Sequence, residues 1–335
     1  MTATLTPPGL ATVASTIRRD RHRLTAAEIR DTLSAYLHAY WLRPENAYWM
    51  TLRHVALSEC SLMGPSADIS CGDGLFSFLH AGGRLAPAFD VFSATGHLEQ
   101  VTQQHADMFD VVDEAYQPPI TREPDWRYDV GTDLKTSMLH KAARLNFYAT
   151  HVQADNNQAL PFEDECFQTV HCNSAYWVTA IDEFLGELHR VTRCSGTIVL
   201  HVKLANMSRY TLEPLRGVLG DNVLDILGRG RLACWPTLAT QSDWERRFNK
   251  SGLRIQSSMP LARAAHAHIW DVGLRPIAPL LVRMTQSLNA ETRDAIKRDW
   301  VALFMDLCQP LCDPDFDAFP GDGEPAEVQY VLRRR

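Results

Sequence analysis

The chain has 335 residues, of which 45% are hydrophobic, so it is long enough for one large domain with additions or for two modest ones. A formal net charge of -7 and a pI near 6.0 exclude a general attraction to phosphate backbones, and we expect no nucleic-acid partner. Eight cysteines without Cys-x-x-Cys spacing predict reduced thiols in a cytoplasmic protein, and no run of 18 apolar residues predicts a membrane span.

The N-terminal part begins with a polar stretch and continues into a helix. Residues 1–24 are polar and contain prolines, which predicts a mobile tail, although the short basic run at 18–23 could also meet a polyanion or a membrane surface. Thr25 followed by Glu28 has the pattern of a helix N-cap, so we predict a helix from there to about Leu42.

A second helix is expected after Pro44, and the two helices form a predicted unit over residues 25–60. Apolar and aromatic side chains recur in both helices at helical spacing, which predicts one buried face on each. We interpret most of these aromatic residues as core packing. One or two of them, such as Tyr40 or Tyr48, could instead reach a ligand pocket.

A glycine-containing turn follows the helices. Residues 68–74 read Asp-Ile-Ser-Cys-Gly-Asp-Gly at the end of an apolar stretch, which is typical of a strand that turns tightly beneath a nucleotide. Alone, the pattern is a weak signal, but further segments follow it in order. They are strands at 128–133, which ends in a carboxylate, 152–155 and 167–173, then a helix at 184–191 and, after a turn at 194–196, a strand at 197–200.

Taken in this order, the segments resemble the class I S-adenosylmethionine-dependent methyltransferases, in particular the group of small-molecule enzymes with a Leu-Pro-Phe motif, here residues 160–162. The resemblance covers roughly residues 61–258. It implies an α/β fold with a Rossmann-like seven-stranded sheet, helical N-terminal and C-terminal additions, and S-adenosylmethionine as cofactor. A helix at 244–248 and strands near 251–255 and 328–332 would complete the sheet.

The resemblance also implies roles for residues of the glycine turn. Asp68 would help to hold the amino-acid end of the cofactor. Gly72 and Gly74 would let the backbone approach the cofactor closely, because a side chain there would collide with it. Ser70 stands where the family pattern has its first glycine.

The ends of the next three strands supply further residues of the implied cofactor site. Asp133 would accept hydrogen bonds from both ribose hydroxyls, with a helix cap as the alternative reading. Asp155 and Asn156 would contact the adenine, unless they form only a turn. Asn173 follows the fourth strand, near the methyl group to be transferred.

The acceptor side is implied by the segment after the fourth strand, where Ser174, Tyr176 and Trp177 would face the substrate. His171 and His201 are candidate catalytic bases, because histidine exchanges a proton near neutral pH, and Tyr176 could orient an acceptor. Each of the three could instead be a packed structural residue. No metal ligand set is predicted.

Two insertions extend the core, which comprises residues 61–258 and 326–335. The first, at about 82–127, contains His97 and His105 among several aspartates, which suit either acid–base or metal chemistry or a solvated cover.

The second insertion, at 259–325, has a largely helical pattern, and we expect it at the carboxyl edge of the sheet as a lid or a dimer surface. Its His266 and His268 would need a third ligand to bind a metal.

The function predicted from these patterns is methyl transfer from S-adenosylmethionine to a small-molecule acceptor, such as a sugar-containing or natural-product intermediate. The expected partners are that substrate and a second copy in a possible homodimer, with no membrane. The alternatives are a protein or RNA methyltransferase and a non-catalytic binding subunit of the same fold. A nicotinamide-dependent oxidoreductase fits poorly, because Ser77 stands where Gly-x-Gly-x-x-Gly spacing requires glycine.

Overall fold

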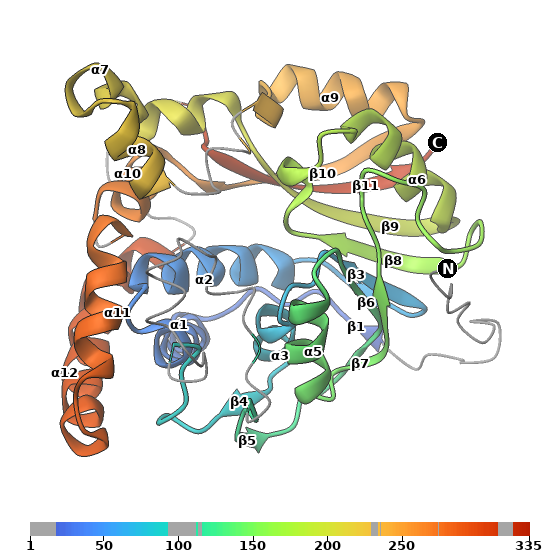
Figure 1. Cartoon of the computed structure of the whole chain (residues 1–335). Helices are drawn as coiled ribbons and strands as arrows, with labels where there is room; N and C mark the ends of the chain where they lie inside the picture. Colours follow the sequence, from blue (N-terminus) through green and yellow to red (C-terminus); the bar gives the residue numbers. More distant parts are fainter. Residues whose placement is uncertain are drawn as a thin grey trace, which may run out of the picture.

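The computed structural model describes residues 18–92, 112, 116–228, 234, 236–273, 275–313 and 324–335. Its centre is a seven-stranded sheet (Figure 1). In spatial order the strands are β10 (Leu253–Ala262), β11 (Glu327–Arg334), β9 (Thr192–Lys203), β8 (Phe167–Cys172), β3 (Ser66–Ile69), β6 (Tyr128–Asp133) and β7 (Tyr148–Gln153).

All neighbouring strands of this sheet pair in parallel except β11, which runs antiparallel to both β9 and β10. The chain order reverses at β3, between β6 and β8, so the switch point of the sheet lies where β3 ends. Open α/β sheets bind ligands at such a point, outside the carboxyl ends of the strands. The predicted Rossmann-like seven-stranded fold is confirmed.

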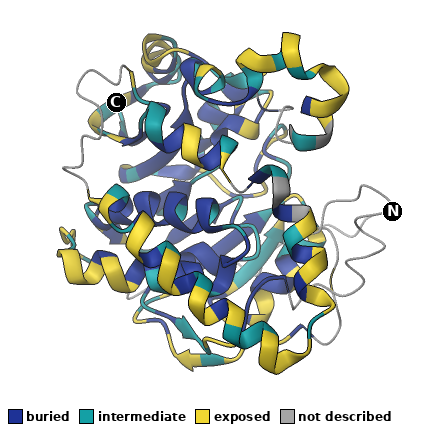
Figure 2. Ribbon diagram, turned by 90° about the vertical axis from the view of Figure 1, so that its left-hand side faces the viewer, coloured by how far each residue is buried: buried dark blue, intermediate teal, exposed yellow. Residues whose placement is uncertain are grey.

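Helices cover both faces of the sheet, and the central strands are therefore buried on both sides (Figure 2). One core cluster includes side chains of α6 (Ile181–Val191) and α9 (Gln241–Lys250). The other gathers side chains of the remaining core helices, which are α1 (Ala26–Tyr40), α2 (Pro44–Ser58), α3 (Leu75–His80) and α5 (Thr136–Arg144).

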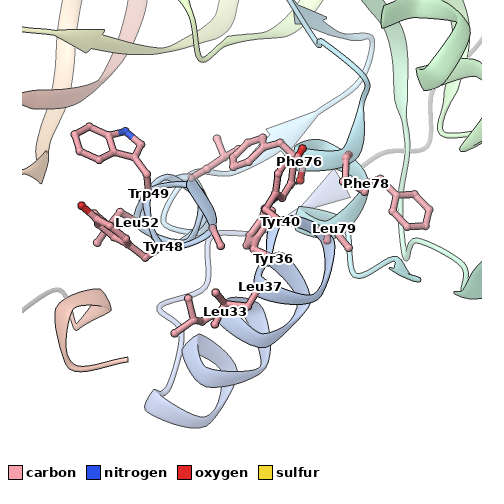
Figure 3. Close-up of a cluster of buried hydrophobic side chains, with 14 of the residues drawn as sticks. Leu33, Tyr36, Leu37, Tyr40, Tyr48, Trp49, Leu52, Phe76, Phe78 and Leu79 are labelled. Carbon is pink, nitrogen blue, oxygen red and sulfur yellow. Dashed lines mark hydrogen bonds between the residues drawn. The ribbon is translucent and has the colours of Figure 1, made fainter. Parts of the chain in front are cut away.

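The two N-terminal helices have the predicted local signals. Thr25 accepts a hydrogen bond from the Glu28 backbone, and Glu28 bonds back to Thr25, which makes a capping box at the start of α1. α2 begins at Pro44, as predicted. Figure 3 shows aromatic side chains of α1 and α3 gathered on one side of α2, with Tyr48 and Trp49 on the other.

The segment before α1 is partly different from the prediction. Within the predicted mobile tail, β1 (Arg18–Arg19) pairs antiparallel with β2 (Leu62–Met63). The Arg19 side chain also contacts His80 of α3. The polar composition of residues 1–24 could not reveal this pairing, because its partners lie some 40 residues away. Residues 1–17 lie outside the described part of the chain.

The first insertion is anchored at its base by β4 (Arg84–Leu85) and β5 (Ile120–Arg122), which pair antiparallel. His97 and His105 lie outside the described residues. The predicted turn at 194–196 lies inside β9, where Phe167 pairs with Thr192 but Thr169 pairs with Thr197, so the intervening residues bulge out of the ladder.

The second insertion leaves the sheet after β10 and returns at β11, and both ends lie beside the carboxyl end of β9, as predicted. Its long helix α12 packs on α1 (Figure 1), where the Trp300 and Trp41 rings meet edge to face at 6.3 Å. Arg293 of α12 also pairs with buried Asp90 of the first insertion. The helices of this region are α10 (Ala264–Val272), α11 (Ala278–Gln286) and α12 (Ala290–Cys308).

Shorter helices connect β9 to α9 and fill the loops. They are α7 (Arg216–Leu219), α8 (Asp221–Gly228) and the 3-10 turns Ala175–Trp177, Ala205–Tyr210, Glu213–Leu215, Arg275–Ile277 and Pro310–Cys312. No helix in the described ranges is long and apolar enough to cross a membrane. α11 and α12 expose apolar side chains such as Leu280, Met284 and Leu303, but the homodimer stays a prediction.

Candidate cofactor and acceptor site

The turn after β3 has a backbone that L-residues rarely adopt. Ser70, Gly72 and Gly74 have φ values of +59°, +61° and +75°. A Cβ added to Gly72 would meet nothing within 4 Å, so this part of the turn faces open space. A Cβ on Gly74 would come within 2.9 Å of the Tyr148 ring. Gly72 therefore leaves room for a ligand, whereas Gly74 is required by packing of the protein itself.

Ser70 keeps the left-handed conformation of the glycine that the family pattern has there. Such a conformation costs a non-glycine residue roughly 1–2 kcal/mol. The Ser70 hydroxyl accepts a hydrogen bond of 2.7 Å from the Asn156 amide, which ties the turn after β3 to the turn after β7. The two predicted cofactor residues thus hold each other in place.

Asp68 lies beneath the turn, 1% exposed, and its carboxylate is already surrounded. One oxygen accepts hydrogen bonds from Ser77 at 2.6 Å and from Tyr148 at 2.7 Å. The other lies 3.2 Å from Nδ1 of His171. The carboxylate therefore joins β3, α3, β7 and β8, and it does not point its oxygens into the open side of the turn, where the sequence predicted a direct cofactor contact.

Asp133 ends β6 beside the open glycine. Its Oδ2 accepts a hydrogen bond from the Gly72 backbone at 3.0 Å, and its Oδ1 accepts one from the Lys135 backbone at 2.9 Å. A carboxylate has about four acceptor positions, so each oxygen keeps one for a further donor. Burial raises the pKa of Asp133 above its ordinary value, against the lowering effect of the two backbone donors. The group fits a ligand with two adjacent hydroxyls.

The turn after β7 is held by its own side chains. Asp155 accepts hydrogen bonds from the backbone and amide of Asn157. Asn157 in turn accepts from Thr179 and Ala180, beyond the end of β8. The predicted adenine-contacting segment is therefore fastened to the predicted acceptor loop, and both lie at the carboxyl edge of the sheet.

The amide of half-buried Asn173, which follows β8, makes no hydrogen bond to any residue that the structure describes. Ser174 is half-buried beside it, and Trp177 is 43% exposed. Tyr176 is buried, and its hydroxyl accepts a hydrogen bond of 3.2 Å from Arg53 of α2. The structure thus brings Asn173 and Tyr176 to the same edge as Gly72 and Asp133, as the sequence predicted.

The two candidate bases are fully buried on the face of the sheet that α2 and α3 cover. His171 is stacked on Tyr128, and Nε2 of His201 lies 2.8 Å from Gln329. Burial lowers the pKa of His201 well below its usual value. Because both side chains have no exposed surface, the structure does not place them where they could take a proton from an acceptor at the sheet edge.

Tyr40 lies beside Asp73, a contact for which the sequence predicted only the role of Tyr40. The Tyr40 side chain, at the end of α1, lies close enough to Asp73 in the glycine turn for each group to affect the pKa of the other. Burial raises the pKa of both groups. Tyr40 thus reaches the site, as one of the two aromatic candidates. Tyr48 instead donates to the His266 carbonyl of the C-terminal insertion.

His266 and His268 do not form the start of a metal site. His266 is buried, and its Nδ1 accepts from the Arg263 backbone at the start of α10. His268 is exposed. Among the residues that the structure describes, no group of three or more potential ligands is arranged for a metal ion. A separate cavity of about 210 Å³ lies between α1 and residues 84–89, away from the glycine turn.

One segment of the chain is similar to a known family. Residues 122–200 match a family model described as a methyltransferase domain. The matched segment includes β6, β7, β8 and most of β9. Asp133 is the last residue of β6, and Asp155 and Asn173 lie just after β7 and β8. Among curated proteins, none matches the sequence.

Several solved structures are similar in fold. An S-adenosylmethionine-dependent methyltransferase from Thermotoga maritima, described as a possible histamine N-methyltransferase, is 12% identical with a TM-score of 0.42, over 92% of this chain and 96% of that one. A methyltransferase of the same cofactor from Mesorhizobium loti is 13% identical with a TM-score of 0.40, over 80% and 90%. A putative methyltransferase solved with the Haloferax volcanii activator Trm112 is 15% identical with a TM-score of 0.39, over 71% and 79%.

Similarities this low say nothing about an acceptor or a partner. The family match over β6 to β9 confirms the predicted enzyme class at the level of the domain. The chain contains a methyltransferase domain, and S-adenosylmethionine is the cofactor expected for it.

Proposed function

We propose that this chain transfers the methyl group of S-adenosylmethionine to a small-molecule acceptor, as in the group of enzymes with the Leu-Pro-Phe motif. The observation that carries the proposal is the pairing of Asp133 with the open turn at Gly72. A carboxylate with two unused acceptor positions stands beside a backbone that leaves room for a ligand, at the switch point of the sheet.

The residues that would hold the cofactor divide into two sets. Asp133 would accept from the ribose hydroxyls, Asp155 and Asn156 would line the adenine, and Asn173 would lie near the methionine end. Asp68 and Ser70 would act from beneath, since their polar atoms hold the turn in shape. Leu160 and Phe162 are buried in the core beside the adenine segment and would be structural.

When bound, S-adenosylmethionine supplies a methyl group on a positively charged sulfur, which is a good leaving group. The protein's part is then to hold the acceptor in line and to exclude water. The segment of Asn173, Ser174, Tyr176 and Trp177 would place the acceptor. We assign no general base, because His171 and His201 are buried away from this edge.

Titration calorimetry of the whole chain with S-adenosylhomocysteine tests the proposal. We expect binding of S-adenosylhomocysteine but not of NAD. Asp133→Asn should weaken binding at least tenfold, because the amide can accept only on its oxygen. Asp299→Asn is the matched control, since Asp299 is exposed on α12. Equal affinity of the two variants would show that the ribose is not held at Asp133.

A further inference from the structure

The last residue of β9 is a lysine buried without an acceptor. Lys203 is 4% exposed, and Nζ makes no hydrogen bond or ion pair with any residue in the described ranges. Three aromatic rings surround it instead. Nζ lies 4.5 Å from the ring centre of Tyr176, 4.7 Å from that of Trp270 and 5.7 Å from that of Trp49.

The natural partner of this lysine is already engaged. Glu327 stands directly opposite Lys203 in the pairing of β9 with β11. Both Glu327 oxygens, however, accept from Arg53, at 2.6 and 3.1 Å, and Oε2 also accepts from the Trp49 indole at 3.0 Å. The Glu327 carboxylate is therefore paired with Arg53, and the Lys203 ammonium in the same buried cluster has no ion-pair partner among the described residues.

An ammonium without a counter-ion is costly to bury, because its three donors lose most of their water. Cation–π contacts with the three rings offset part of this cost but satisfy none of the donors. The arrangement is more stable when an anionic oxygen enters beside Nζ. The charge and geometry of the cluster therefore favour an anion beside Nζ, and none of the residues assigned to the cofactor takes part in the cluster.

The position of Lys203 indicates which ligand brings that anion. β9 ends next to β8, and Tyr176, which forms one wall of the aromatic cage, belongs to the segment proposed to hold the acceptor. Trp270 comes from α10 of the C-terminal insertion, and Trp49 comes from α2. The cage is thus built from the acceptor segment and from both helical additions.

We propose that Lys203 binds a carboxylate or phosphate group of the methyl acceptor, while the rings of Tyr176, Trp49 and Trp270 enclose the part of the acceptor next to that group. The acceptor role rests on the proposed methyltransferase function. The anion site itself rests only on the geometry and charge of the cluster.

Calorimetry with small probes tests the site. The whole chain, saturated with S-adenosylhomocysteine, is titrated with benzoate, with phenyl phosphate and with neutral benzamide. We expect one of the two anions to bind at least tenfold more tightly than benzamide, and the preferred anion tells carboxylate from phosphate. In Lys203→Met the preference should disappear. Lys250→Met is the matched control, because Lys250 is an exposed lysine paired with Asp182.

Two further measurements keep the outcomes distinct. Thermal unfolding of Lys203→Met should give a Tm no lower than that of the wild type, since the substitution removes an unpaired charge. Lys203→Gln provides a second neutral variant for the binding measurements. Equal binding of all three probes, or a preference that persists in both Lys203 variants, would overturn the anion site. Loss of S-adenosylhomocysteine binding with an intact anion preference in the free protein would instead refute the proposed function alone.

Discussion

Replacement of Asp68 tests whether its carboxylate has a structural role or contacts the cofactor. In the wild type, Asp68 accepts two short hydroxyl hydrogen bonds, from Ser77 and Tyr148, and faces His171. Asn in its place can keep its oxygen toward both hydroxyls, so each bond persists without charge assistance. Hydrogen bonds to charged groups contribute about 1.5–3 kcal/mol and neutral ones about 0.5–1.5 kcal/mol, so the two bonds together lose about 2 kcal/mol.

Asp68→Ala should cost more, about 4 kcal/mol, because two buried hydroxyls lose their acceptor and a cavity remains. The free energy of unfolding is measured by urea denaturation followed by circular dichroism. Since Asp68 acts from beneath the turn, Asp68→Asn should bind S-adenosylhomocysteine within about threefold of the wild type. Unchanged stability of Asp68→Asn would refute the structural role. A stable variant with affinity lowered 30-fold or more would show that the carboxylate contacts the ligand after all.

Three further predictions concern charge and backbone. Below pH 6.5 the free energy of unfolding should decrease, because burial depresses the folded-state pKa of three histidines. The pKa of His54 is lowered to about 3, and those of His80 and His201 lie well below the usual value. In this range the unfolded state binds more protons than the folded state, so each histidine lowers the free energy of unfolding by up to about 1.4 kcal/mol per pH unit. A free energy of unfolding that stays constant from pH 6.5 to 5, measured by urea denaturation, would contradict this prediction. Gly74→Ala should lower the free energy of unfolding by about 2–4 kcal/mol in the same assay, because of backbone strain and the clash with Tyr148. Gly72→Ala should lower it by only about 1 kcal/mol but should weaken S-adenosylhomocysteine binding. Similar losses of stability in the two variants would contradict the distinction between the two glycines. Glu327→Gln should cost about 3–5 kcal/mol, because it leaves the buried Arg53 charge without its counter-ion, and a loss below 1 kcal/mol would show that Arg53 finds solvent.

Features with local causes were predictable from the sequence. The capping box at Thr25 and the strand that ends at Asp133 depend on residues that lie close together in the chain. The positive φ at Gly72 follows from the turn that a strand needs before a helix. The order of strands and helices along the chain then predicted the parallel part of the sheet, since strands that alternate with helices pair in parallel and leave their carboxyl ends on one edge.

The features that the sequence did not reveal depend on contacts between distant segments. Asp68 lies near the end of β3, as expected, but its oxygens are occupied by Ser77, Tyr148 and His171, which come from three other elements. Lys203 is a single charged residue after an apolar run, which was the only signal available. Its cage comes from α2, α10 and the segment after β8, whose proximity only the fold establishes.

The most direct test of the cofactor site is a crystal structure of the whole chain with S-adenosylhomocysteine. We expect the ribose hydroxyls within hydrogen-bond distance of the Asp133 carboxylate, the adenine beside Asp155 and Asn156, and the amino-acid end over Gly72. The Asp68 carboxylate should keep its bonds to Ser77 and Tyr148. Density for the ligand at any other place, or a bound ligand that leaves Asp133 without contact, would contradict the account.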